Sequence, residues 1–302
     1  MMTSPTVYTI PKRRRGMTIL EVIIAITLIG IIGVSLVQIL RTQLRFADRQ
    51  VATNNAREVS RAALNAFTTD IRMVDADSGV LAAASDSLTV VTPYASGVVC
   101  GPNGAGGSVV ALLPYDSVNY AEGGYAGYAY IDTTTTGTKY SEVYQYVYTG
   151  TTPTSIDSAT AATTAPCQTA TDNVGIFKAG ALVVSPAIPD RSRYKAVILF
   201  RKVTYAFRSS SSVAGARGLF RTVVGGTRGT EELVAPFDTT SGFQYYLNTG
   251  VKVTSATGAT LRLVRGVQLE LDGQSENIVP GTTTVQRAPL TTAIFFKNRP
   301  LL

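Results

Sequence analysis

The chain has 302 residues, of which 45% are hydrophobic and 16% are charged, and its formal net charge is +7. This composition is that of a globular chain with few charges, and it argues against intrinsic disorder. Histidine is absent, which excludes Ser–His and Cys–His catalytic pairs and His-ligated metal sites.

Other common catalytic signatures are also missing from the sequence. Two cysteines are too few for a four-ligand zinc site, and neither a phosphate-binding glycine loop nor a Gly-x-Ser-x-Gly motif occurs. The composition leaves open a carboxylate-only enzyme, but no pair of acids stands out. We therefore expect neither a cofactor nor enzymatic activity.

The most informative segment lies near the start of the chain. Four consecutive cations precede Gly16, namely Lys12, Arg13, Arg14 and Arg15. An apolar run over residues 17–40 follows, and a helix of this length would extend about 36 Å, enough to cross the ~30 Å hydrocarbon core of a bilayer. The run contains one charge, Glu21. A carboxylate in hydrocarbon costs roughly 2.5–3.5 kcal/mol on insertion scales, so Glu21 is a candidate functional residue.

Three ordinary export signals explain this segment less well. A secretory signal peptide has an apolar core of about 7–15 residues and then a small-x-small cleavage site, and this run is longer and lacks such a site. Arg13 and Arg14 suggest a twin-arginine signal, but the apolar run begins too abruptly and continues too far. A plain membrane anchor explains the run and its basic flank, yet an anchor has no use for Glu21.

The combination of basic leader, glycine, apolar run and early glutamate resembles the type IV prepilin signal, which type II secretion pseudopilins share. The resemblance implies that a prepilin peptidase cuts between Gly16 and Met17 and that Met17 is then methylated. It also implies that Glu21 is the carboxylate used in assembly.

Three more residues of the segment bear on this resemblance. Thr18 and Leu20 fit the signal, whereas Ile19 stands where Thr or Leu is more common. Removal of the leader, residues 1–16, would remove four cations and leave a net charge of +3. A mildly basic chain is weak support for nucleic-acid binding, so we do not expect a nucleic-acid partner, although the charge leaves one open.

The helix is predicted to continue beyond the span, because no Gly or Pro occurs between residues 34 and 78. Apolar residues mostly recur at three- and four-residue steps and form one face, which is interrupted at Asn55. These residues are Leu40, Leu44, Ala47, Val51, Val59, Ala63, Phe67, Ile71 and Val74. We expect the helix to end near residues 75–79 and to form a transmembrane and assembly segment over residues 17–77.

Two sets of residues on this helix have open interpretations. Gly30 and Gly33 indicate either close helix contacts and local unwinding, or the ordinary composition of a membrane helix. Arg41, Arg45 and Arg49 recur every four residues. They could meet anionic lipid head groups or acids on a neighbouring subunit, or they could form a solvated face.

Residues 78–302 are predicted to form an extracytoplasmic β-rich head. Candidate strands separated by turn-forming residues cover 87–92, 108–113, 125–131, 140–148, 181–185, 195–207, 218–224, 243–247, 260–271 and 291–297. Residues 149–172 and 209–216 have the composition of loops. Residues 93–180 are predicted to be an insertion into a simpler sheet.

Tyrosines and cysteines mark the predicted insertion. Eight tyrosines fall between Tyr120 and Tyr148, which favours either a recognition face for a partner, sugar or surface, or simply strand formation. Cys100 and Cys167 form an even pair in a chain that has the features of an exported protein. We predict a disulfide between them, with two separate buried thiols as the alternative.

The order of segments after residue 195 supports a second resemblance. The stretches KAVILFRKVTYAFRSS, GLFRTVV, EELVAPFDTTSGFQYYL, TLRLVRGVQLEL and TTAIFF are similar to the heads of PilW-like minor pilins and J-type pseudopilins. This similarity implies an α+β fold in which the long helix packs on an antiparallel sheet. It also implies a single-pass inner-membrane protein whose helix bundles with those of other pilins or pseudopilins in a filament.

Three functions remain open at this stage. The chain could be a minor pilin or pseudopilin near a filament tip, or a bulk structural pilin. It could also be a membrane-tethered adhesin or binding domain that never polymerises.

Overall fold

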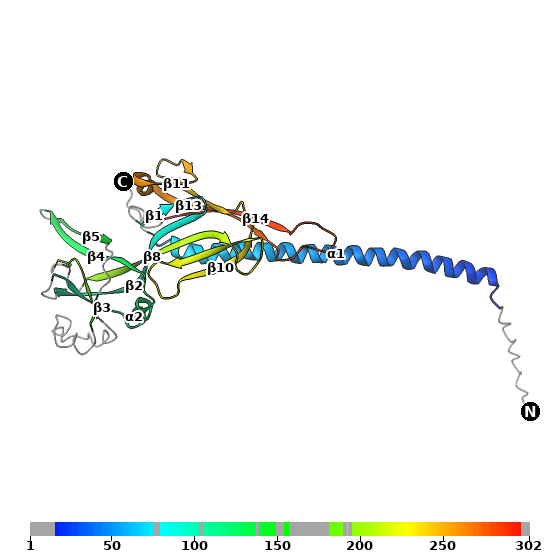
Figure 1. The fold of residues 1–302 in the computed structure, drawn as a ribbon, viewed down its shortest axis with the longest axis horizontal. Coiled ribbons are helices and arrows are strands. Elements are labelled where there is room, and N and C mark those ends of the chain that lie inside the picture. The colour runs from blue at the N-terminus through cyan, green and yellow to red at the C-terminus, as the bar shows by residue number, and fades with distance from the viewer. Residues whose placement is uncertain are drawn as a thin grey trace, which may run out of the picture.

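The structure of the protein is a computed structural model that describes residues 16–74, 79–102, 106–136, 139–148, 154–156, 181–189, 192 and 195–296. A long N-terminal helix, α1 (Ile19–Ile71), is followed by a large antiparallel β-sheet (Figure 1). The predicted α+β class is therefore confirmed.

Helix α1 begins two residues later than the predicted segment 17–77, at Ile19, and it ends earlier. Thr18 caps its first turn, and Arg72 follows its last residue with a backbone N–H that bonds to the carbonyls of Thr68 and Asp70. The expected end near residues 75–79 is wrong. Val74 is fully buried although it lies beyond the helix, so its apolar character reflects core packing and not a helical position.

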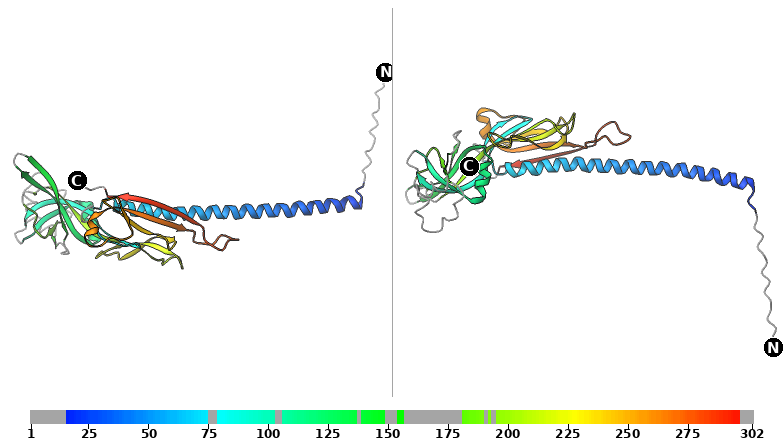
Figure 2. Two further views of the ribbon diagram at one scale, coloured as in Figure 1. Left: turned by 90° about the horizontal axis from the view of Figure 1, so that it is seen from above. Right: turned by 60° about the horizontal axis from the view of Figure 1, so that its bottom comes forward.

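The two halves of α1 have different surroundings. The C-terminal half lies along the sheet, whereas the N-terminal half projects away from the head (Figures 1 and 2). Every large apolar side chain from Met17 to Phe46 is exposed, from 38% at Val22 to 82% at Ile19. The projecting half is the one helix segment of the described residues that is long and apolar enough to cross a membrane.

The head contains one 14-stranded sheet in which all pairs are antiparallel. The strands are β1 (Val80–Ala83), β2 (Ser87–Pro102), β3 (Ser108–Leu112), β4 (Tyr125–Thr136), β5 (Lys139–Tyr148), β6 (Thr154–Ile156), β7 (Ala181–Val184), β8 (Ala196–Ser209), β9 (Arg217–Val223), β10 (Thr230–Phe237), β11 (Gly242–Leu247), β12 (Lys252–Val253), β13 (Val264–Gln274) and β14 (Arg287–Phe295). Their main order is β12-β11-β13-β10-β9-β8-β2-β3-β7-β6, with β1 on β2, β14 on β13, and β4 between β8 and β5.

Each predicted strand overlaps a strand of the structure, but one prediction begins too early. The segment 260–271 starts with a 3-10 helix, η3 (Gly258–Leu263), and β13 begins only at Val264. The alternation that includes Leu261 and Leu263 therefore misled the prediction. The sequence analysis also missed α2 (Pro114–Ala121) and the strands β1, β6, β10 and β12.

Two hydrophobic cores share the long strands β2 and β8. The first core lies between α1 and the strands β8 to β14, and the second lies around β3, β4, β7 and the adjoining parts of β2 and β8. We call the described residues between 94 and 200 the distal lobe. In all the views of Figures 1 and 2 this lobe lies beyond the C-terminal end of α1, at the opposite end of the molecule from the N-terminus.

Small residues allow α1 to approach the sheet closely. Its buried face is formed by Ala52, Ala56, Ser60, Ala63, Phe67 and Ile71. A Cβ atom added to Gly273 of β13 would lie 2.2 Å from the carbonyl oxygen of Ala56. The Gly273 N–H donates to Ser60 Oγ at 3.2 Å, and Ser60 Oγ donates to the Ala288 carbonyl at 3.3 Å.

This packing corrects the predicted apolar face of the helix. Leu40, Leu44 and Val51 are exposed, and the buried stripe passes instead through Ala52, Ala56 and Ser60. The reason is steric, because the close approach of β13 favours small side chains over large ones.

An ion pair holds the C-terminal end of α1 on the sheet. Arg221 of β9 donates to Asp70 Oδ2 from Nε at 3.2 Å, and its Nη2 lies 3.2 Å from the same oxygen. The hydroxyl of Tyr205 on β8 donates to this oxygen as well, and burial followed by the charge of Asp70 raises the pKa of Tyr205. Loss of one partner from such a buried pair leaves an uncompensated charge.

The close contact at Gly273 predicts a specific sensitivity to one added methyl group. Gly273→Ala should lower the free energy of unfolding by about 1–3 kcal/mol, because backbone must move to relieve the overlap. Urea denaturation of the detergent-solubilised chain, followed by circular dichroism, measures the change. Gly33→Ala is the matched control, since a Cβ atom there meets nothing within 4 Å. Equal stability of the two variants would contradict the close approach.

Candidate functional site

The residues of the predicted processing site lie immediately before α1. Gly16, Met17 and Thr18 are exposed and outside the helix, and the chain becomes helical at Ile19. The four leader cations, residues 12–15, lie outside the described residues. The Gly16–Met17 peptide bond is therefore in non-helical, exposed backbone.

Thr18 fixes the point at which the helix starts. Its backbone is extended, and its Oγ1 accepts a hydrogen bond from the Glu21 N–H at 3.3 Å. The Thr18 carbonyl also accepts from the N–H groups of Glu21 and Val22, at 3.1 and 3.2 Å. A side-chain oxygen at this position satisfies an N–H group that would otherwise lack a partner at the helix terminus.

Glu21 lies in the first turn of α1, where a carboxylate is favoured by the helix dipole. Its side chain is exposed, and within the described part of the chain its carboxylate has no ion-pair partner. The neighbouring side chains Leu20 and Val22 are apolar and also exposed. Glu21 is thus a single negative charge on a helix surface suited to hydrocarbon.

The hydroxyl groups farther along the span are satisfied within the helix. Thr27 Oγ1 donates to the carbonyls of Ile24 and Ile23 at 2.8 and 3.1 Å, and Ser35 Oγ donates to the Ile31 carbonyl at 2.9 Å. Such bonds allow Ser and Thr to lie in a helix that crosses a membrane. An ionised carboxylate has no hydrogen to donate to a backbone carbonyl. Glu21 therefore cannot be satisfied within the helix as Thr27 and Ser35 are.

The two glycines of the span are not in close contact with any other described part of the chain. A Cβ atom added to Gly30 or Gly33 would meet nothing within 4 Å. The arginines Arg41, Arg45 and Arg49 are likewise exposed on the helix. The structure of one chain therefore does not distinguish between the interpretations given above for the two glycines, nor between those given for the three arginines.

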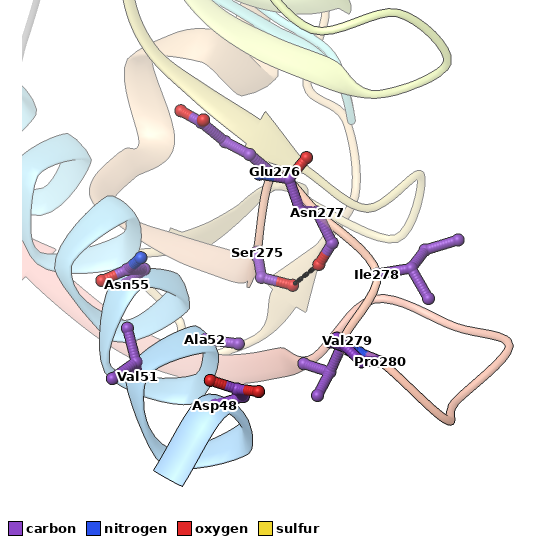
Figure 3. A pocket seen from close by; sticks show the side chains of 10 residues that line it. All are labelled: Asp48, Val51, Ala52, Asn55, Ser275, Glu276, Asn277, Ile278, Val279 and Pro280. Atoms are coloured by element: carbon purple, nitrogen blue, oxygen red, sulfur yellow. Dashed lines mark hydrogen bonds between the residues drawn. The ribbon is translucent and has the colours of Figure 1, made fainter. Parts of the chain in front are cut away.

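A cavity lies where the head meets the middle of α1. It has a volume of about 340 Å³ and is bounded by Asp48, Val51, Ala52 and Asn55 of the helix and by residues 275–280 after β13. Figure 3 shows the two sides, with Ser275 Oγ bonded to the Asn277 carbonyl at 2.9 Å. Its lining is mixed and open, with the acid Asp48 on the helix side and the acid Glu276 on the side of the head. No group of three or more His, Cys, Asp or Glu residues suited to a metal ion occurs among the described residues.

The other sequence predictions concern the distal lobe. Cys100 is buried on β2, but Cys167 lies outside the described residues, so the disulfide stays a prediction. The tyrosines separate into two groups. Tyr120, Tyr125, Tyr128 and Tyr130 belong to the second core, whereas Tyr144, Tyr146 and Tyr148 are exposed on β5.

Comparisons with known proteins identify the N-terminal segment. A family model described as the prokaryotic N-terminal methylation motif matches residues 11–37. Neither the curated proteins nor the solved structures include a match to the chain. The motif, together with the long apolar helix that follows it, fits a type IV pilin-like protein with a membrane-anchored helix and a periplasmic head.

The sequence analysis did not recognise the role of Thr18 in capping the helix. The signal was available, because Thr18 and Glu21 have the Ser/Thr-x-x-Glu spacing of a capping box. The first hydrogen bond of that motif, from the Glu21 N–H to Thr18 Oγ1, is present.

The exposed position of the Gly16–Met17 bond leads to a prediction about processing. The mature chain should begin at Met17, with a methylated amine. Intact-mass and N-terminal peptide measurements on membrane fractions test this directly. Gly16→Val should abolish cleavage without affecting the fold, because a side chain at residue 16 meets nothing within 4 Å. A wild-type chain that starts at Met1, or beyond Leu40, would contradict the prediction.

The capping bond leads to a prediction about the first turn of α1. Thr18→Ala should reduce the hydrogen-exchange protection of that turn about fivefold, since loss of a cap costs about 1 kcal/mol. Thr18→Ser should retain the protection. Amide hydrogen exchange in detergent micelles makes the comparison. Thr27→Ala, which removes a hydroxyl that caps nothing, serves as the control. Equal loss of protection in the Ala and Ser variants would show that the hydroxyl is not the cap.

Proposed function

We propose that the protein is a minor pilin or pseudopilin that assembles through α1 into a type IV pilus or a type II secretion pseudopilus. The observation that carries this proposal is the exposed carboxylate of Glu21, the one charge within residues 17–40, on an apolar helical segment that no other described residue covers. The methylation motif over the same residues supports it.

In this proposal each part of the chain has a distinct role. A prepilin peptidase and methyltransferase removes residues 1–16, which include the cations Lys12 to Arg15, and methylates Met17. Residues 17–77 hold the protein in the inner membrane and later bundle with the helices of other pilins. Residues 78–302 form the head outside the membrane, with residues 93–180 as an insertion.

Glu21 would act as an electrostatic partner for another subunit. The freed N-terminal ammonium of a neighbour and the Glu21 carboxylate attract strongly in a medium of low dielectric constant. Either charge alone would remain uncompensated at a cost of several kcal/mol. The pair would therefore select the axial register of the helices as well as stabilise their bundle.

A position at the filament tip or in a priming complex agrees with the shape of the head. The distal lobe extends beyond the C-terminal end of α1, away from the membrane-spanning end (Figure 1). A bulk subunit has neighbours packed above it in the filament, whereas a tip subunit has none. The space above a tip subunit would accommodate the distal lobe without steric conflict.

A membrane-tethered adhesin that does not polymerise is the second candidate. The exposed tyrosines Tyr144, Tyr146 and Tyr148 on β5 favour it, because aromatic side chains with polar tips suit recognition surfaces. The two candidates differ in their need for Glu21, since a tethered domain requires a span but no carboxylate within it.

The first prediction separates assembly from tethering. Glu21→Ala should leave membrane insertion and cleavage intact, because the altered span is more apolar, but it should impair recruitment into a complex with partner pilins. A pull-down with those pilins compares the variant with the wild type. Glu58→Ala, which removes an exposed acid from the same helix outside the span, is the control. Wild-type recruitment of Glu21→Ala would favour the tethered adhesin.

The second prediction concerns copy number. A tip or priming subunit should be present in sheared filaments at no more than a few percent of the main subunit. Quantitative mass spectrometry of those filaments provides the ratio. If this chain is instead the dominant filament protein, the tip position is wrong and a structural pilin replaces it.

A further inference from the structure

A polar cluster lies at the junction between the distal lobe and the rest of the head. Thr92 of β2 and Tyr125 of β4 are each paired in register with Arg201 of β8, so the three residues form a row across neighbouring strands. The Tyr94 ring lies next to this row, with the Arg201 guanidinium 5.6 Å from its centroid. Tyr120 of α2 stacks on Tyr94 with a centroid distance of 6.4 Å.

Four polar atoms of this cluster are buried and have no hydrogen-bond partner among the described residues. They are Thr92 Oγ1, Tyr94 Oη, Tyr125 Oη and Arg201 Nε. Thr92 is only 1% exposed and Tyr94 only 9% exposed. A buried donor or acceptor left without a partner destabilises the folded state, so four such atoms at one place need a physical explanation.

The chemistry of the cluster indicates what could satisfy these atoms. The charge of Arg201 already faces Glu122, whose carboxylate lies 3.6 Å from Arg201 Nη1 and 2.7 Å from Arg228 Nη2. An additional anion is therefore not required. Burial raises the pKa values of Tyr94 and Tyr125, which keeps both phenols protonated and able to donate or accept. A small neutral molecule that both donates and accepts hydrogen bonds fits this set.

We infer that Thr92, Tyr94, Tyr125 and Arg201 form a binding site for internal water beneath α2. Water accepts from the Arg201 Nε–H group and exchanges hydrogen bonds with the three hydroxyls, and buried waters typically make about three such bonds. The site joins β2, β4 and β8 below a helix of the distal lobe. It lies beside the place where Gly123 pairs with Gly226, so it stabilises the junction between the distal lobe and the part of the sheet next to β9.

The sign of the stability change in Tyr→Phe variants of the full chain tests this inference. If water bonds to the phenols, Tyr94→Phe and Tyr125→Phe should each raise the unfolding equilibrium constant roughly fivefold. The double variant should show less than the product of the two effects, because both variants lose bonds to the same water. If the hydroxyls have no partner, each variant should be as stable as the wild type or more stable, and the inference fails.

One control and one structural measurement complete the test. Tyr115→Phe removes a hydroxyl from the exposed face of α2, where the side chain is 78% exposed, and it should leave the equilibrium constant unchanged. A high-resolution crystal structure of the wild-type chain should place water within hydrogen-bond distance of Tyr94 Oη and Tyr125 Oη. Direct contact of these oxygens with protein atoms alone would overturn the inference.

Discussion

Burial of apolar surface is the constraint on which the rest of this structure depends, and α1 meets it in two different ways. The C-terminal half of the helix is covered by the chain's own sheet, through Ala56, Ser60 and Phe67. The half from Met17 to Phe46 is not covered by any of the residues that the structure describes. An exposed apolar surface of this extent is not stable in water and requires lipid or other helices around it. Glu21 is the one charged residue between Met17 and Leu40, so its environment depends on whether lipid or other helices surround this segment.

Contacts between α1 and the sheet fix the position of the head relative to the helix. Gly273 permits backbone contact with α1, and Asp70 ties the end of the helix to Arg221 and Tyr205. The strands β2 and β8 then continue into the distal lobe. Packed residues therefore connect α1 to the distal lobe through the strands β2 and β8. In the proposed filament, the register chosen by Glu21 would thus also set the position of the distal lobe.

Much of this arrangement could be predicted from the sequence, and the failures have physical causes. The span, its single charge and the long helix follow from hydropathy and from the lack of Gly and Pro. The end of α1 was missed because Val74 is apolar for tertiary reasons and not helical ones. Leu261 and Leu263 alternate like strand residues but belong to a 3-10 helix.

The buried stripe through Ala52, Ala56 and Ser60 depends on contact with Gly273, a residue distant in sequence, so no local pattern could reveal it. Of the candidate site, the sequence predicted roles for Gly16, Met17 and Glu21, which stay predictions, and it did not predict the capping role of Thr18.

The central claim is that the charge of Glu21, and not its size or polarity, brings this protein into an assembly. Glutamine replaces the carboxylate with a neutral group of the same shape, so Glu21→Gln isolates the charge. The fraction of processed chain that co-purifies with partner pilins, measured by quantitative mass spectrometry, is the most direct test. The account predicts normal insertion and processing of Glu21→Gln with little incorporation into the complex. Incorporation of Glu21→Gln at the wild-type level would contradict it.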